Sequence, residues 1–122
     1  MLKSLILTAS ILAVSIPASA REVTIGGVGA GGCETWLNIR AQARSSRAGV
    51  TNIDVENMLI SWVQGYLSGV AAHSADYDPF AGPDSDKISL WLDGFCGRLP
   101  ASALTRALDL FAWDQHQRSH TK

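Results

Sequence analysis

The sequence predicts an all-α protein: a small four-helix orthogonal bundle, tied by one disulfide and preceded by a cleaved signal peptide. Between residues 55 and 70, apolar residues recur at three- and four-residue steps, which is the spacing of one helix face. No stretch of useful length alternates apolar and polar residues, so the sequence predicts no sheet. The chain has only two cysteines and starts with an apolar leader.

The leader covers residues 1–20. Lys3 supplies a positive start, residues 5–16 form an apolar run, and residues 18–20 are small, as at a cleavage site. The run is too short for a membrane span. We therefore expect cleavage after Ala20 and export to an oxidising compartment, the periplasm of a Gram-negative cell. Composition does not separate the periplasm from the medium.

Cleavage would leave residues 21–122, which is enough chain for one domain. Residues 21–32 are rich in glycine and predict a flexible spacer. Residues 33–118 are expected to form the helical domain, and residues 119–122 a frayed tail. Residues 27–32 match the pattern G-x-G-x-x-G of dinucleotide-binding loops, but no strand precedes them, so we reject that interpretation.

Two helices are expected before the central loop. The first spans about residues 34–47 and is closed by Gly49. The second starts at a capping box formed by Thr51 and Asp54 and extends to about His73. The residues that form its apolar face are Val55, Leu59, Trp62, Val63, Tyr66, Leu67 and Val70.

A second surface of this helix carries small residues, including Gly65 and Gly69. Glycine costs about 1 kcal/mol relative to alanine inside a helix, so two of them call for a reason. We expect another helix to approach closely at this surface.

Residues 76–86 predict a loop, because two prolines and a glycine oppose regular structure there. The third helix is expected from about residue 85 to residue 97. Pro100 fits the first turn of a fourth helix, which runs to about Arg118. Each predicted helix carries one tryptophan, and we expect all four to pack in the core with Tyr66. The four are Trp36, Trp62, Trp91 and Trp113.

Cys33 and Cys96 are expected to pair, because exported thiols tend to oxidise. The chain-entropy model gives about 4 kcal/mol for a closed loop of about 64 residues. The bond would tie the start of the first helix to the end of the third. The alternatives are two free thiols or a metal pair, and two cysteines without nearby histidines make a poor zinc site.

Charge excludes several partners. Without the leader, nine basic and eleven acidic side chains remain, a net charge of −2. This balance gives no general attraction to nucleic acid or anionic lipid, and no remaining stretch is apolar enough to span a membrane. Arginines gather in residues 35–50 and aspartates in residues 76–93. These runs indicate a solvated helix face and an acidic loop, or a dipolar surface that orients a partner.

Catalytic and metal-binding motifs are not organised in this sequence. The aspartates of the central loop fail the spacing of an EF-hand. His116 and His120 lie four residues apart without a third ligand, and His73 ends the second helix, where the helix dipole favours a positive charge. No nucleophile-elbow or lactamase motif is present. We therefore expect neither an enzyme nor a cofactor.

The spacing of cysteines and tryptophans resembles a group of short exported proteobacterial proteins. It is similar to HdeA-like acid-stress chaperones and to Tai-type immunity proteins, which neutralise peptidoglycan-cleaving toxins. The resemblance covers about residues 33–112 and implies a small, periplasmic, disulfide-tied helical domain. Residues 65–69 resemble the immunity proteins, whereas the single disulfide resembles the chaperones. The residues that carry the resemblance are Cys33, Trp36, residues 62–69, Trp91, Leu92, Cys96 and Pro100.

We therefore expect a soluble periplasmic binding protein of the HdeA-like kind, with a stress-responsive chaperone as its specific form. The alternative is an immunity factor, or a small component of an envelope secretion system, that binds one dedicated protein. The expected partners are thus a protein or unfolded clients. A homodimer fits a small helical domain that hides apolar surface. An acid chaperone needs carboxylates whose protonation loosens its packing.

Overall fold

The computed structural model describes residues 24–45, 47–74, 78–79 and 84–121. The predicted leader, its cleavage site after Ala20 and most of the central loop lie outside these residues. The described chain contains a short 3-10 helix, η1 (Val28–Gly31), followed by four α-helices and no strand. These are α1 (Gly32–Arg44), α2 (Val50–Ala72), α3 (Ser85–Arg98) and α4 (Leu104–His120). The all-α prediction with four helices is confirmed.

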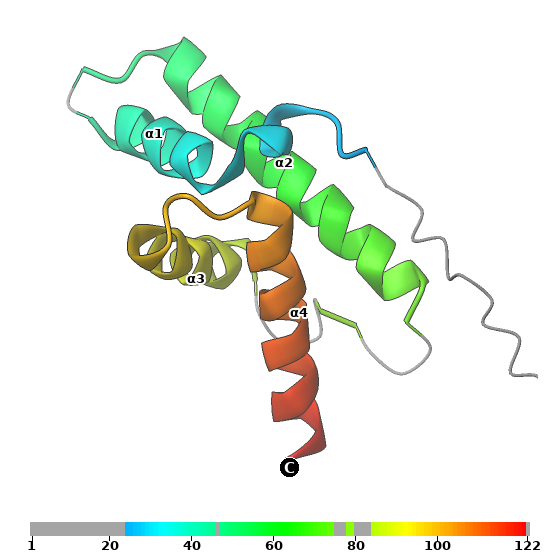
Figure 1. Cartoon of the computed structure of the whole chain (residues 1–122). Coiled ribbons are helices and arrows are strands. Elements are labelled where there is room, and N and C mark those ends of the chain that lie inside the picture. The colour runs from blue at the N-terminus through cyan, green and yellow to red at the C-terminus, as the bar shows by residue number, and fades with distance from the viewer. Residues whose placement is uncertain (1–23, 46, 75–77, 80–83, 122) are drawn as a thin grey trace, which may run out of the picture.

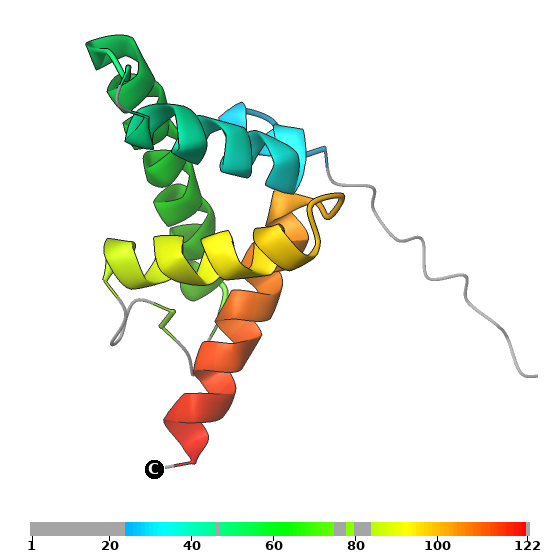
Figure 2. The same ribbon diagram turned by 90° about the vertical axis from the view of Figure 1, so that its left-hand side faces the viewer.

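The four helices form two pairs, and the helices of one pair cross those of the other. Helices α1 and α3 lie side by side, and α2 and α4 run across them (Figures 1 and 2). Each of the four helices contacts the other three, so one core serves the whole domain.

The core lies where the four helices meet. Trp36 of α1 and Phe111 of α4 are its largest fully buried side chains. The stripe on α2 is spaced by four residues and the stripe on α4 by three or four, as expected for one face of each helix. The remaining buried apolar side chains are Cys33, Leu59, Val63, Leu67, Ile88, Leu92, Phe95, Cys96, Leu104, Ala107, Leu108 and Ala112.

The disulfide between Cys33 and Cys96 is present, with 5.0 Å between the two Cα atoms. It joins the first turn of α1 to the last turn of α3, as the sequence predicts. The backbone N–H of Cys33 also donates to the carbonyl of Ser102 at 2.9 Å, next to the start of α4. Three helix ends therefore meet at one point.

Several helix ends differ from the prediction. Helix α1 ends at Arg44, and Gly49 does not close it but precedes the first residue of α2. The N–H of Gly49 donates to Asn52 Oδ1 at 3.1 Å, so the predicted capping box at Thr51 and Asp54 is wrong.

The fourth helix also starts and ends later than predicted. Pro100 lies in a turn, closed by the N–H of Ser102 donating to the carbonyl of Leu99 at 3.0 Å, and α4 begins only at Leu104. At the other end α4 continues to His120, two residues into the predicted tail. At α3, Asp84 caps the helix by accepting from the N–H of Lys87.

The glycine-rich segment is packed where the sequence predicts a flexible spacer. We call residues 24–31 the N-terminal strap. Gly29 is buried, and a Cβ at this position would overlap the indole ring of Trp62. The strap therefore needs glycine there because its backbone lies directly against an aromatic ring. The structure thus gives one residue of the predicted spacer a packing role, while the flexibility expected of residues 21–32 stays a prediction.

Candidate functional site

A cluster of charged side chains joins three helices, with Asp93 of α3 at its centre. Asp93 Oδ1 accepts from Trp36 Nε1 at 2.8 Å and from Arg40 Nε at 3.1 Å. Asp93 Oδ2 accepts from Arg40 Nη2 at 2.8 Å and from Arg44 Nη2 at 2.6 Å. Arg40 Nη1 donates to Glu56 Oε1 of α2 at 2.6 Å. We call these five residues the Asp93 cluster.

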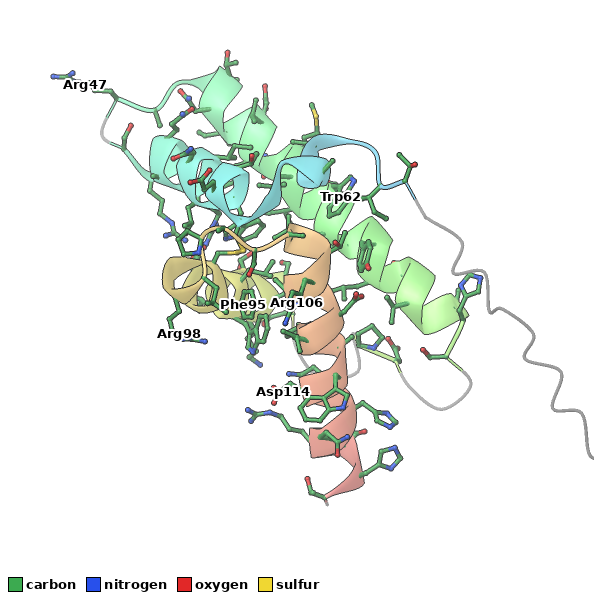
Figure 3. All side chains as sticks on the ribbon, viewed as in Figure 1. Arg47, Trp62, Phe95, Arg98, Arg106 and Asp114 are labelled. Carbon is green, nitrogen blue, oxygen red and sulfur yellow. A yellow bond between two sulfur atoms is a disulfide. The ribbon has the colours of Figure 1, made fainter. Side chains whose placement is uncertain are left out.

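The helical repeat of α1 explains how the cluster assembles. Trp36, Arg40 and Arg44 follow one another at four-residue steps, so they project from one face of α1. That face is turned toward α3 and α2, and the side chain of Arg40 is only 13% exposed. The arginines predicted to lie on a solvated helix face are therefore largely engaged within the molecule. Of the three arginines in residues 35–50, Arg47 points away from the bundle (Figure 3).

The electrostatics of the cluster favour the charged forms of its members. Burial by itself would raise the pKa of Asp93, but hydrogen bonds from Arg40, Arg44 and Trp36 and the charge of Arg40 outweigh burial. Together they lower the pKa of Asp93 from 3.8 to about 2. The hydrogen bond to Asp93 likewise holds the pKa of Arg40 above its ordinary value, against the opposing effect of burial.

Strong acid would neutralise the carboxylate of Asp93 at the centre of the cluster. A protonated Asp93 carries no charge, so Arg40 and Arg44 would lose the carboxylate that compensates them. Removing one partner from a part-buried ion pair is costly, because the other charge stays desolvated. The cluster can therefore act as a tie between α1, α2 and α3 that weakens in strong acid.

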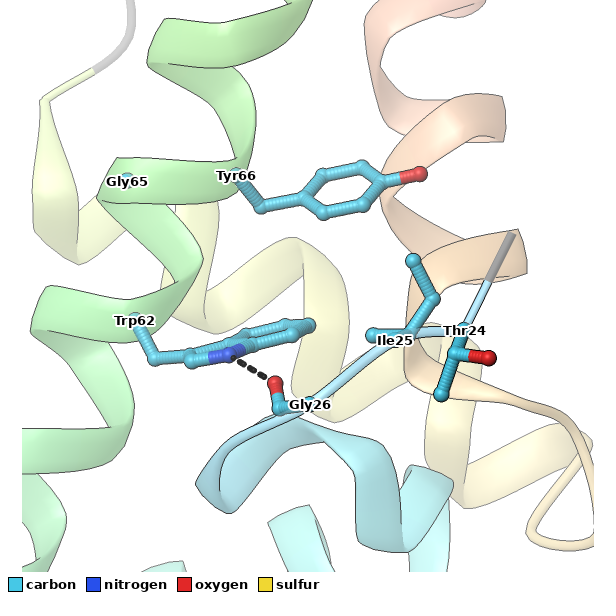
Figure 4. Close-up of a pocket in the computed structure, with 6 residues that line it drawn as sticks. All are labelled: Thr24, Ile25, Gly26, Trp62, Gly65 and Tyr66. Carbon is cyan, nitrogen blue, oxygen red and sulfur yellow. Dashed lines mark hydrogen bonds between the residues drawn. The ribbon is translucent and has the colours of Figure 1, made fainter.

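A second feature is an open apolar pocket between the strap and α2. It is lined by Thr24, Ile25, Gly26, Trp62, Gly65 and Tyr66 and has a volume of about 340 Å³ (Figure 4). We call it the aromatic groove. The rings of Trp62 and Tyr66 stack with their centroids 5.7 Å apart. Trp62 Nε1 donates to the carbonyl of Gly26 at 3.0 Å.

Tyr66 connects the aromatic groove to α4. Its hydroxyl donates to Asp109 Oδ1 at 2.8 Å. Burial, the hydrogen bond and the charge of Asp109 together raise the pKa of Tyr66 to about 12, so the hydroxyl stays protonated at neutral pH.

Apolar side chains on the outer face of α4 form a third feature. Trp113 is 61% exposed and Leu110, one turn earlier, is 39% exposed. The prediction that Trp113 packs in the core is therefore wrong. The inner stripe of α4 runs through Leu104, Leu108 and Phe111, and position 113 lies on the opposite side of a helix that packs this stripe inward.

The other predicted packing residues divide into two groups. Trp36 is fully buried, Trp62 and Tyr66 pack against the core, and Trp91 stacks on Phe95. Gly65 and Gly69, in contrast, are exposed, and a Cβ on either would meet no described atom within 4 Å. No other described helix approaches them closely, so the predicted helix contact at this surface is wrong.

Sequence reasoning missed the Asp93 cluster, although two signals were present. Asp93 is a lone acid within the apolar body of the predicted third helix, between Leu92 and Phe95. Trp36, Arg40 and Arg44 share one helical face by spacing alone. What the sequence could not supply is the side-by-side packing of α1 and α3 that brings these residues together.

Comparison with known proteins gives no relative for this chain. No family model, no curated protein and no solved structure matches it. Within the described residues, no group of three or more histidines, cysteines or acids is placed to hold a metal ion. None of the described helices is both long enough and apolar enough to cross a membrane.

Proposed function

We propose that this protein is an exported, periplasmic binding protein of the HdeA-like kind, which acts as an acid-responsive chaperone for unfolded clients. The observation that supports this proposal is the Asp93 cluster. Asp93 compensates two arginines of α1, and one of them, Arg40, also pairs with Glu56 of α2, so protonation of Asp93 weakens a network that joins three helices. Loosening exposes apolar surface, which is what an unfolded client needs.

The direction of the pH effect follows from the pKa of Asp93. Its folded-state pKa is lowered from 3.8 to about 2, so the folded protein holds the ionised form more strongly than the unfolded chain does. The stabilisation is complete above about pH 4 and is lost as the pH falls toward about 2. The cluster therefore holds the bundle closed at neutral pH and releases it only in strong acid.

The test is the aggregation of an acid-sensitive client, followed by light scattering, with and without the purified oxidised protein. We expect protection at about pH 2–3 and little at neutral pH. Asp93→Asn imitates the protonated acid and is expected to protect at higher pH than the wild-type protein. Asp114→Asn is the matched control, because Asp114 pairs with Arg118 one turn away on the same helix, α4. Absence of protection by the wild-type protein in acid would remove this function.

A second function is favoured by the exposed side chain of Trp113. An immunity factor, or a small component of an envelope secretion system, binds one dedicated protein while fully folded, and exposed aromatic side chains often anchor such contacts. This function requires no loosening of the bundle.

The two functions separate in a capture experiment from envelope extract at neutral pH. If one dedicated partner exists, the wild-type protein retains it and Trp113→Ser loses it. Leu90→Ser is the matched control, because Leu90 is equally exposed on α3. Recovery of only unrelated proteins at neutral pH would count against this second function.

A further inference from the structure

The tip of the strap, residues 24–26, occupies the aromatic groove as a bound ligand would. The side chain of Ile25 lies beside the rings of Trp62 and Tyr66, and the next carbonyl, that of Gly26, accepts from Trp62 Nε1 (Figure 4). The groove thus already holds an extended chain, with an apolar side chain followed by a hydrogen-bonded carbonyl.

The strap tip fills the groove only in part. Ile25 keeps 37% of its surface exposed, and the hydrogen bond to Gly26 is open to solvent. About 340 Å³ of space remains beside it. This volume is at the lower end of ligand pockets, and its lining is mostly apolar, so it suits a few side chains of a peptide.

Glycine positions define what else the groove accepts. A Cβ at Gly27 would lie 2.8 Å from Trp62 Nε1, so the residue after the bonded carbonyl must be small. Gly65, which lines the groove on α2, is not crowded in this way. A Cβ there would meet no described atom of a neighbouring segment within 4 Å. No described contact requires glycine at that position, and its absent side chain leaves room for a second backbone to approach the helix.

We propose that the aromatic groove binds an extended polypeptide segment in which a large apolar residue is followed by small residues, and that this segment replaces the strap tip. The apolar side chain takes the place of Ile25 and fills the open volume. The carbonyl of the next residue accepts from Trp62 Nε1. The inference rests on the proposed function, because it names the surface that holds the client. Unfolded chains present segments of this kind, whereas folded proteins bury them.

The probe is a short peptide that alternates leucine and glycine, titrated calorimetrically into the full oxidised chain at about pH 2–3, the range in which client protection is expected. Gly65 lines the groove and has open space at its Cβ position, so Gly65→Leu adds a side chain at the groove. We expect a folded protein with affinity reduced by about tenfold or more, equivalent to about 1.4 kcal/mol. Gly97→Leu is the matched control, because Gly97 lies in α3 and also has open space at its Cβ position. It should bind the peptide as the wild-type protein does.

Ile25→Ser tests the replacement of the strap tip. The variant removes the apolar side chain that competes with the peptide, so we expect the affinity to rise by about threefold. Weaker binding by Ile25→Ser would show that the tip is a wall of the site, and would overturn the proposal. Unchanged binding by Gly65→Leu, or no binding of the peptide by the wild-type protein, would also overturn it.

Failure of this inference can be told from failure of the proposed function. If the wild-type protein protects clients in acid but does not bind the peptide, the groove is not the binding surface and the chaperone function stands. If the variants bind the peptide with the expected order of affinities but no client is protected, the groove is supported as a peptide-binding site. The acid-responsive chaperone function is then not supported.

Discussion

The two sides of the bundle are held in different ways. On the side of α1 and α3, a disulfide and a cluster of five side chains connect the helices, and every charged member but Arg44 is mostly buried. On the side of the aromatic groove, one exposed hydrogen bond holds the strap tip, and two glycines lie open. Within the described residues, the covalent bond and the part-buried ion pairs thus lie on the side of α1 and α3.

The largest expected effect comes from breaking the disulfide. A double substitution, Cys33→Ala with Cys96→Ala, releases a loop whose ends are 63 residues apart in sequence. We expect the free energy of unfolding to fall by about 4 kcal/mol, because the unfolded chain regains the entropy of the open loop. Urea unfolding followed by circular dichroism measures the change. A loss below about 1 kcal/mol would mean that the cross-link constrains the domain little.

Loss of the central carboxylate should have the next largest effect. Asp93→Asn leaves Arg40 part-buried without its main compensating charge, and we expect a loss of about 2–3 kcal/mol in the free energy of unfolding. The control Asp114→Asn removes an exposed pair on α4 and should change stability by less than about 1 kcal/mol. Equal effects of the two substitutions in urea unfolding would contradict the larger contribution to stability assigned to the Asp93 cluster.

Two glycine substitutions on the groove side should change the free energy of unfolding in opposite directions. Gly29→Ala forces a methyl group into the indole ring of Trp62 and should destabilise the domain by about 1–3 kcal/mol. Gly65→Ala meets open space in the middle of α2 and should stabilise it by up to about 1 kcal/mol. Thermal unfolding measures the change in stability of each variant. Destabilisation by Gly65→Ala would show that the fold requires glycine at this position.

The smallest effect on stability is expected at Trp113. Trp113→Ser removes a side chain that is 61% exposed, so the free energy of unfolding should change by about 0.5 kcal/mol or less. A loss several times larger would show that the indole covers the core in solution. Urea unfolding of this variant beside Leu90→Ser gives the comparison.

The local and covalent parts of the fold were accessible from the sequence. The apolar stripe of α2, through Leu59, Val63 and Leu67, repeats at the helical period, so neighbouring residues alone reveal it. The disulfide follows from two cysteines and the chemistry of an oxidising compartment. Both inferences need no knowledge of how the helices cross.

The parts that failed depend on contacts between distant segments. The composition of the glycine-rich strap predicts flexibility. Only its contact with Trp62, more than thirty residues away, gives Gly29 a packing role. The Asp93 cluster needs α1 and α3 side by side. Trp113 is different, because its place opposite the stripe of Leu104, Leu108 and Phe111 was visible from the helical repeat. That error came from counting tryptophans without asking which face each one occupies.

The disulfide also determines how the molecule would respond to mechanical tension. A force applied to the two ends of the oxidised chain passes from Cys33 directly to Cys96, so the backbone between them carries no load. Helix α4 is the one α-helix that lies entirely outside this shielded loop, and it would extend first with the strap. Reduction would add 63 residues of hidden length, roughly 200 Å at about 3.3 Å per residue.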